Sequence, residues 1–164
     1  MPAVSNTSPI LNLAVINRLD LLRQQFDEVF VPPAVLSELK PETGFPGTGS
    51  IRQALDTQWL RLVELKDVHL LRALALELDE GEAAAIALAL ELGIRRILMD
   101  ERDGRAKAKA LGLQPTGVVG VLLRAKQDGN LDSVEAAMLA LRREAGFFIA
   151  DELFTDVLTE AGER

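Results

Sequence analysis

The feature that most constrains the fold is the alternation of short β-prone segments with longer helical segments along the whole chain. The helical segments show capping residues, proline starts and glycine stops, whereas the β-prone segments are short and apolar. We expect strands at 2–5, 28–31, 60–65, 97–99 and 113–116. We expect helices at 10–16, 19–25, 33–40, 51–58, 70–78, 83–92, 105–111, 118–127, 131–143 and 151–160. Strands separated by helices pair in parallel and carry helices on both faces, so the sequence predicts an α/β fold with a central parallel sheet of four or five short strands.

No linker, internal repeat or low-complexity tract divides the chain. Its 164 residues, 48% of them hydrophobic, suit one domain with a two- or three-layer core. The segment 41–50 is rich in glycine, proline and hydroxyl residues, so we expect a loop there and consider it the best candidate for a mobile segment. The sequence therefore predicts a single domain over residues 1–164.

The absence of cysteine excludes disulfides, thiol nucleophiles and cysteine-ligated zinc. The one histidine, His69, has no serine or second histidine nearby, and we interpret it as a solvated residue at the start of a helix. The formal charge of −7 argues against a protein that coats DNA through overall positive charge. A nuclease stays possible, because acids that bind metal make the formal charge of such an enzyme more negative.

No segment has the length or character of a membrane span. The longest apolar run, 83–90, is closed by Glu82 and Glu91 and is far shorter than the roughly 20 residues that cross a bilayer. No basic residue precedes the apolar segment 10–16, as a signal peptide would require. We therefore expect a cytoplasmic protein that makes no contact with a membrane.

Four polar residues are expected at one edge of the sheet. Asn6 follows the first strand and Asp100 ends the fourth, and parallel strands bring both to the same edge. Glu82 lies in the first turn of the helix 83–92, and Glu38 lies in the helix after the second strand. Oxygen ligands of this kind suit Mg²⁺ or Mn²⁺, which polarise phosphoryl oxygens and lower the pKa of bound water. The set predicts a divalent-metal site for phosphodiester hydrolysis.

Each of these residues also has a purely structural alternative. Glu82 can complement the helix dipole with Asp79 as the cap, and Glu38 can be a solvated helix residue. Asp100 can cap the helix that follows it, and Asn6 can cap the helix 10–16. The metal-site hypothesis depends on the four positions occurring together.

Four segments in order resemble the PIN-domain superfamily, and more narrowly its prokaryotic VapC-related branch. They are 4–9 (VSNTSP), 31–38 (VPPAVLSE), 78–83 (LDEGEA) and 98–102 (LMDER), and the continuation 112–126 (GLQPTGVVGVLLRAK) also matches that branch. Each segment is modestly specific, but their order and spacing together are a strong signal. The resemblance covers nearly the whole chain.

The resemblance implies a Rossmann-like α/β/α fold, a Mg²⁺- or Mn²⁺-dependent ribonuclease activity and frequent pairing with a small antitoxin. Carried over by position, Glu38, Glu82 and Asp100 match the second, third and fourth acids of the family. Glu101 or Asp103 could supply a further ligand through water. Thr7 and Ser8 match hydroxyls beside the first acid.

Asn6 departs from the family pattern, because it stands where the family usually has its first metal-binding aspartate. An amide oxygen can bind Mg²⁺ but carries no charge, so this site should hold metal more weakly than one with an aspartate. The alternative function is therefore a catalytically weakened or inactive module that binds RNA or a protein partner. A nucleotide-binding domain is a third and weaker reading, because no G-x-G-x-x-G motif or P-loop follows the first strand.

Basic residues close to Asp100 are candidates for phosphate contacts. Arg105 and Lys109 share a helix face at i,i+4 spacing; the others are Arg95, Arg96, Arg102 and Lys107. Pairing with the neighbouring acids is the alternative role for this helix. There is no tyrosine, and Trp59 suits the core or an interface, so base stacking has weak support.

The apolar faces of the last helices, with Phe147, Phe148 and Phe154, could complete the core. They could also hold a homodimer or the helix of an antitoxin. The sequence therefore predicts RNA, a small antitoxin and a second copy of the chain as partners, without assigning a surface to each.

Overall fold

Five parallel strands form one sheet in the computed structural model, which describes residues 1–164. The strands are β1 (Ala3–Ser5), β2 (Val29–Val31), β3 (Leu60–Leu62), β4 (Arg96–Leu98) and β5 (Gln114–Thr116), in the order β3-β2-β1-β4-β5. The register pairs Val4 of the central strand with Phe30 on one side and Ile97 on the other. This confirms the predicted α/β fold with a parallel sheet.

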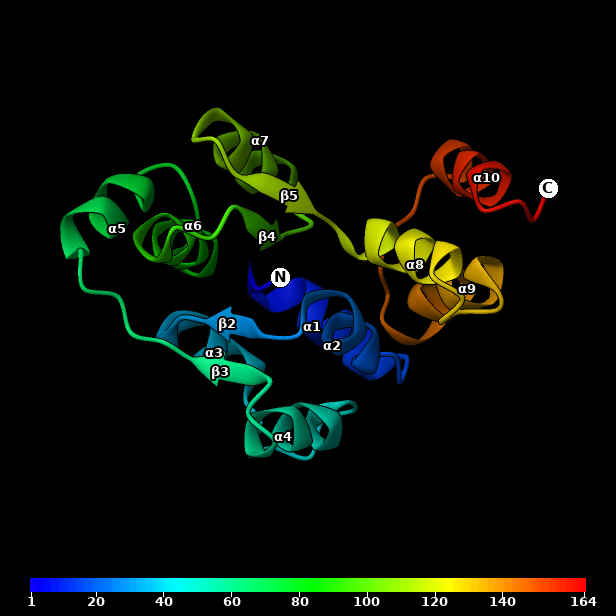
Figure 1. Cartoon of the computed structure of the whole chain (residues 1–164), viewed down its shortest axis with the longest axis horizontal. Coiled ribbons are helices and arrows are strands. Elements are labelled where there is room, and N and C mark those ends of the chain that lie inside the picture. Colours follow the sequence, from blue (N-terminus) through cyan, green and yellow to red (C-terminus); the bar gives the residue numbers. More distant parts are fainter.

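Helices cover both faces of the sheet (Figure 1). On one side lie α1 (Thr7–Val15), α2 (Asp20–Phe26), α3 (Pro33–Leu39), α4 (Thr48–Asp56) and α8 (Val118–Gln127), with α9 (Val134–Glu144) packed on α1 and α8 and α10 (Asp151–Glu160) packed on α9. The other carries α5 (Val68–Leu74), α6 (Glu80–Leu92) and α7 (Arg102–Ala110). The result is the predicted three-layer α/β/α arrangement.

The alternation of side chains along each strand separates two hydrophobic cores. Ala3 and Leu98 belong to the core shared with α1 and α8, whereas Val4, Ile97 and Met99 belong to the core shared with α6. Strands with both faces covered are apolar on both sides, which explains why β1 is buried at all three of its positions.

Helix α6 is buried along almost its whole length, from Gly81 to Ala89. It packs against β1 and β4 of the sheet and against α3, α5 and α7. Its alanine-rich sequence suits this position, because small side chains let neighbouring elements approach from every side. Gly93 ends the helix in the left-handed conformation, with a φ of 69°.

Several element boundaries differ from those expected from the sequence. Helix α4 begins at Thr48, because the Thr48 hydroxyl bonds to the carbonyls of Thr43 and Phe45 and starts the first turn inside the expected loop. Helix α7 begins at Arg102 rather than at residue 105, and β3 ends at Leu62 rather than at residue 65. Strand β4 ends at Leu98 rather than at residue 99, so Met99 separates the strand from Asp100.

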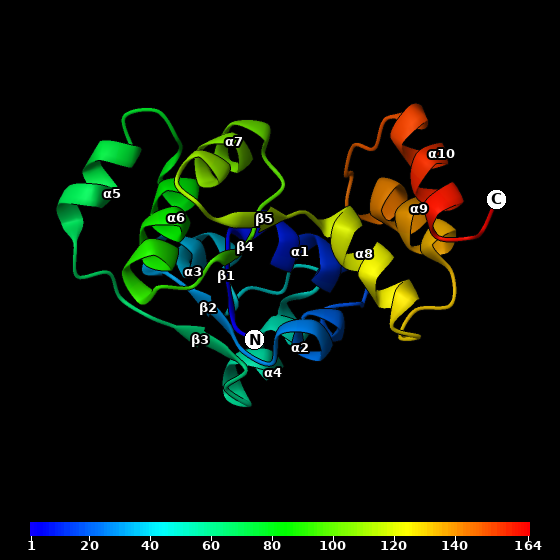
Figure 2. The same cartoon turned by 45° about the horizontal axis from the view of Figure 1, so that its top comes forward.

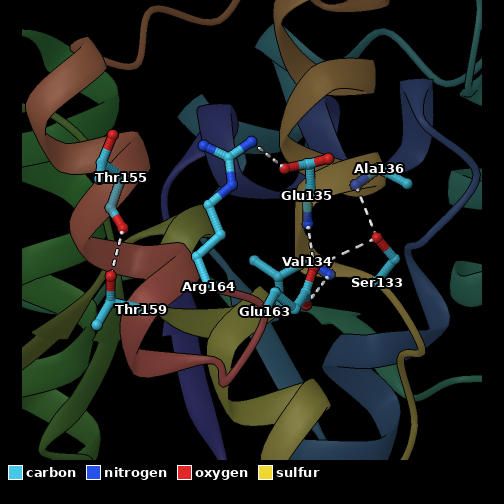
Figure 3. A network of polar contacts seen from close by, with 8 residues as sticks. All are labelled: Ser133, Val134, Glu135, Ala136, Thr155, Thr159, Glu163 and Arg164. Atoms are coloured by element: carbon cyan, nitrogen blue, oxygen red, sulfur yellow. Dashed lines mark hydrogen bonds and ion pairs between the residues drawn. The ribbon is translucent and has the colours of Figure 1, made fainter.

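The last three helices lie together at one end of the molecule (Figures 1 and 2). Glu163, just after α10, accepts hydrogen bonds from the backbone N–H groups of Val134 (2.7 Å) and Glu135 (3.1 Å) at the start of α9 (Figure 3). Lys126 of α8 approaches the same carboxylate at 3.4 Å. The end of the chain is thereby fastened to the N-terminus of α9.

No helix in this fold combines the length and the apolar character that crossing a membrane requires.

Candidate functional site

The candidate site begins where the two central strands leave the sheet. The backbone N–H of Asn6 bonds to the carbonyl of Leu98 at 2.9 Å, which continues the β1–β4 ladder to the ends of both strands. Asn6 is the N-cap residue of α1 by position, but its side chain makes no capping hydrogen bond. Its amide is buried, with 5% of the residue exposed, and remains free to bind another group.

Asn6 and Glu38 meet beside Gly81 in the first turn of α6. A Cβ added to Gly81 would lie 3.1 Å from the Asn6 Oδ1 atom and would collide with the Glu38 Oε1 atom. Glycine at this position therefore leaves room for two side-chain oxygens, from different elements, that could bind a metal ion. The Thr7 hydroxyl, next along the chain, is buried and has no hydrogen-bond partner within the protein. It acts on the nearby Glu38 carboxylate, whose pKa it lowers, although the two do not form a hydrogen bond of ordinary geometry.

Glu82 forms a reciprocal capping box with Asp79 at the start of α6. The Glu82 N–H donates to the Asp79 Oδ1 atom at 2.8 Å, and the Asp79 N–H donates to the Glu82 Oε2 atom at 3.3 Å. The structural alternative for Glu82 is therefore realised. The other carboxylate oxygen, Oε1, lies 3.1 Å from where a Cβ of Gly104 would be, so it is turned toward α7. Capping uses one oxygen of Glu82 and leaves the second for another role.

Asp100 is held by hydrogen bonds from two helices. The Val118 N–H at the start of α8 donates to its Oδ1 atom at 2.8 Å, and the Ser8 hydroxyl donates to its Oδ2 atom at 3.1 Å. The amide of Asn12 in turn donates to the Ser8 oxygen at 3.0 Å. Each carboxylate oxygen thus accepts one hydrogen bond and keeps a lone pair for a further partner. The orientation of Asp100 is fixed without exhausting its binding capacity.

Three carboxyl groups of this region have raised pKa values. Burial raises the pKa of Glu82 to about 7, and the nearby charges of Asp79 and Glu101 act in the same direction. Desolvation raises the pKa of Glu38, with further contributions from Asp79 and Glu80, while the Thr7 hydroxyl beside it acts in the opposite direction.

Burial also raises the pKa of Asp100. The hydrogen bonds from Val118 and Ser8 and the charge of Arg105 oppose this shift, whereas Glu101 adds to it. Buried carboxylates whose charge is only partly compensated hold protons more tightly, and a bound cation would relieve the repulsion between them.

The remaining acids expected from the sequence separate into two places. Glu101 raises the pKa of both Glu82 and Asp100, and it lines a cavity together with Asp100 and Ser8. Asp103 lines a different cavity, with Glu77 and Lys107. The structure brings Glu101 to the acidic edge and places Asp103 elsewhere on α7.

The basic residues of α7 also separate. Arg105 bonds to the Met99 carbonyl at 3.0 Å and lies beside Asp100 and Gly117, so it faces the candidate site. Arg102 and Lys109 are exposed and form no ion pair. The neighbouring Lys107 is paired with Glu77 at 2.5 Å. Of the predicted phosphate contacts on α7, Arg105 is the one that lies next to Asp100.

Asp79, Glu80 and Asn12 contribute to this region although no functional role was predicted for them. The charges of Asp79 and Glu80 raise the pKa of Glu38, and the Asn12 amide orients the Ser8 hydroxyl through a hydrogen bond. The density of acids at 79–82 was a usable signal for the first two. Asn12 follows Ser8 by one helical turn, which could have suggested the contact between them.

The chemistry of these residues fits a divalent cation. No three Asp, Glu or His side chains stand close enough together to hold an ion by themselves. Mg²⁺ and Mn²⁺ do not need such a cage, because they commonly bind through one or two carboxylates together with water and substrate phosphate. Two oxygens meeting at Gly81 and the unpaired Thr7 hydroxyl beside them supply such a partial set.

Comparison with known proteins identifies the family. No curated protein and no solved structure matches the chain. A family model described as a PIN domain matches residues 2–163, which is nearly the full length. PIN domains are generally nucleases and typically use divalent metals. The fold, the acidic edge and this match agree: the chain belongs to the PIN-domain family.

Proposed function

We propose that this protein is a Mg²⁺- or Mn²⁺-dependent endoribonuclease, with Asn6, Glu38, Glu82 and Asp100 as its metal-binding residues and the three acids as its catalytic residues. The observation that carries the proposal is the meeting of two side-chain oxygens, from Asn6 after β1 and from Glu38 of α3, beside Gly81 of α6, with Asp100 joined to α1 through Ser8. The family match supports hydrolysis of phosphodiester bonds.

The chain's own residues have distinct tasks in this proposal. Glu38 and Asn6 hold the ion on one side, and Asp100 presents a carboxylate whose orientation Val118 and Ser8 fix. Glu101, which shares a cavity lining with Asp100, would act through a bound water. Arg105 neutralises phosphate charge beside Asp100. A bound divalent ion supplies polarisation of the phosphoryl oxygens and a more acidic water.

The test is cleavage of total RNA and of tRNA in the presence of Mn²⁺ by the wild type and by Asp100→Asn. We expect the wild type to cleave and the variant to lose most of the activity. Asp103→Asn is the matched control, since it removes the same charge from a residue in a different cavity. Equal cleavage by the wild type and Asp100→Asn would assign the activity to another site or a contaminant.

A second candidate function is a non-catalytic module that binds RNA or protein, and the observation that favours it is the amide at Asn6. Calorimetric titration with Mn²⁺ compares the wild type with Asn6→Asp. If the module is non-catalytic, the wild type binds Mn²⁺ weakly and the added charge strengthens binding by about tenfold or more. Tight binding by the wild type with no gain in the variant would eliminate this candidate.

We also propose that the protein acts as the toxin of a toxin–antitoxin pair and forms a homodimer, as the likeness to the VapC-related branch suggests. Growth arrest on expression, relieved by co-expression of a small protein from a neighbouring gene that co-purifies with it, would support the toxin role. Growth unaffected by expression of an active nuclease would contradict it.

A further inference from the structure

The segment between α9 and α10 lies beside the acidic edge, although it is far from it in sequence. Phe147 and Phe148 line two cavities, of about 540 and 410 Å³, and Asp100 borders both of them. Figure 2 shows this segment passing close to the end of β5 and the start of α8. An aromatic pair therefore stands next to the residue proposed to hold the metal.

This segment is anchored on both sides of Phe148. The Phe147 N–H bonds to the Leu141 carbonyl at 3.0 Å, and Arg142 donates to the carbonyl of Ile149, whose side chain is buried. Gly146 makes the turn out of α9 with a φ of 63°, which glycine adopts at little cost. Phe148 itself is 85% exposed. A large aromatic side chain is thus presented to solvent from a backbone held in place.

The larger cavity combines an apolar wall with charge. Phe147, Phe148 and Val119 form its apolar part, and Arg105 and Asp100 lie in the same lining. Arg105 forms no ion pair with any carboxylate, so its charge is available to an anion. Proteins that bind single-stranded nucleic acid combine such features, with aromatic side chains stacking on bases and cations following the phosphates.

We propose that Phe148 is a base-stacking platform for a single-stranded RNA whose phosphate lies at the Asp100 edge, with Arg105 contacting the backbone. The inference rests on the proposed function and adds its substrate class and a substrate-binding residue. The cavity has the size of a small-ligand pocket and accommodates one nucleobase. Stacking tolerates any base, so this contact selects for unpaired strands rather than for sequence.

The charges in the lining favour RNA over a protein occupant. An apolar helix from an antitoxin or from a second copy would bury both Asp100 and Arg105 against a surface with no partner for them, which is costly. A nucleotide supplies a base for the phenylalanines and a phosphate for the arginine. It also continues directly into the acidic edge.

The test measures binding of a fluorescent single-stranded RNA oligomer and of the same oligomer with one abasic position, with Ca²⁺ replacing Mn²⁺ to limit cleavage. We expect Phe148→Ala to weaken binding of the intact oligomer by about tenfold and to abolish its advantage over the abasic one. Phe148→Trp should retain binding, and its fluorescence should be quenched when the oligomer binds. Trp59 is buried and contributes a constant background.

Phe45→Ala is the matched control, because Phe45 is also an exposed phenylalanine in a loop. Its loop packs against Ala14 and Val15 at the far end of α1 from Asn6, and we expect binding equal to that of the wild type. A duplex RNA bound with the same dependence on Phe148 would overturn the single-strand assignment. Unchanged RNA binding by Phe148→Ala would overturn the platform itself. The same conclusion would follow if the wild type were a dimer, Phe148→Ala were a monomer and both bound RNA equally well.

The outcomes separate this inference from the nuclease proposal. Metal-dependent cleavage by the wild type together with an inert Phe148 would leave the nuclease standing and reject the platform. Binding that depends on Phe148 without metal-dependent cleavage would support the platform and reject the nuclease. A wild type that binds no RNA would reject the platform.

Discussion

Two carboxylate regions of this protein have opposite electrostatic character. At the C-terminal edge of the sheet, Glu38, Glu82 and Asp100 have raised pKa values, chiefly because of burial. Where the residues after α10 meet the start of α9, burial would likewise raise the pKa of Glu163. The N–H groups of Val134 and Glu135 and the charge of Lys126 instead hold this pKa below its ordinary value.

The difference lies in the partners that each region supplies. Glu163 is surrounded by donors and a cation that come from the protein itself, so its charge is already compensated (Figure 3). The acids of the edge have mainly other acids as neighbours, and Arg105 is the one cation acting on Asp100. A compensated carboxylate stabilises the fold, whereas uncompensated ones retain the capacity to bind a cation at some cost to stability.

The largest expected effect is the loss of cleavage in Glu82→Gln. The amide keeps the size of the side chain and an oxygen for the Asp79 N–H, but it removes the charge that would contact the metal. We expect Mn²⁺-dependent RNA cleavage to fall by at least about a hundredfold. The parallel change Glu163→Gln should leave cleavage within about twofold of the wild type, since it lies outside the metal site. Equal losses in the two variants would show that the activity assay reports folding rather than chemistry.

The second prediction concerns the pH dependence of stability in the metal-free protein. Because the pKa of Glu82 is about 7 in the folded state and 4.5 ordinarily, the folded protein retains a proton between these values that the unfolded chain has released. The stability contributed by this group is therefore complete below pH 4.5 and is lost as the pH rises toward 7. The full shift corresponds to about 3 kcal/mol, which solvent screening reduces to on the order of 2 kcal/mol. Urea unfolding in EDTA at several pH values measures it.

Glu163 should show the opposite sign. Its folded-state pKa is lowered, so its contribution is complete above pH 4.5 and is lost as the pH falls through the folded value. Comparison of the wild type with Glu82→Gln and with Glu163→Gln isolates the two profiles. If the difference in unfolding free energy between the wild type and each variant did not change with pH, the two regions would not differ in their electrostatic contribution to stability.

The third prediction is the loss of stability in Glu163→Gln at neutral pH. The amide oxygen can still accept one N–H from the start of α9, but the charge that interacts with Lys126 and the helix terminus is gone. We expect the free energy of unfolding to fall by about 1 kcal/mol, as for the loss of a helix cap. Glu160→Gln, an exposed change in α10, is the control and should have an effect below about 0.5 kcal/mol. An equal effect of both changes would mean that the contacts of Glu163 add no stability.

The fold could be predicted from the sequence more fully than the site. The alternation of strands and helices is a local pattern, and the capping box of Asp79 and Glu82 follows from residues three apart. Sheet order is set by packing, yet the parallel topology alone was sufficient to bring Asn6 and Asp100 to one edge. The error at Thr48 arose because the hydroxyl's bonds to Thr43 and Phe45 form only when the loop folds back.

The positions of individual side chains within the site could not be derived from local patterns. Asp103 and Arg105 are two residues apart on one helix, yet Arg105 faces Asp100 and Asp103 lines another cavity. The position of Phe148 beside Asp100 depends on how α9 and α10 pack, which no short-range signal encodes. Glu38 was expected at the edge from the place of its helix after the second strand, and the family resemblance supported that assignment, since an exposed glutamate in a helix has no distinguishing pattern of its own.

The smallest expected effect comes from Gly81→Ala, which tests whether the space at the acidic edge is itself functional. Alanine favours the helix by about 0.5–1 kcal/mol, but its methyl group would occupy the place of the Glu38 Oε1 atom. Glu38 is exposed and can turn away, so we expect stability to be unchanged or higher while Mn²⁺ affinity and cleavage fall by about fivefold.

Gly49→Ala is the matched control for Gly81→Ala, because Gly49 is likewise the second residue of its helix and a Cβ there would meet no neighbouring atom. It should gain stability and leave cleavage unchanged. If Gly81→Ala cleaves RNA as fast as the wild type, the Glu38 carboxylate does not act from its position beside Gly81. The acidic edge that is compared with Glu163 would then consist of Glu82 and Asp100, whose positions do not depend on the space beside Gly81.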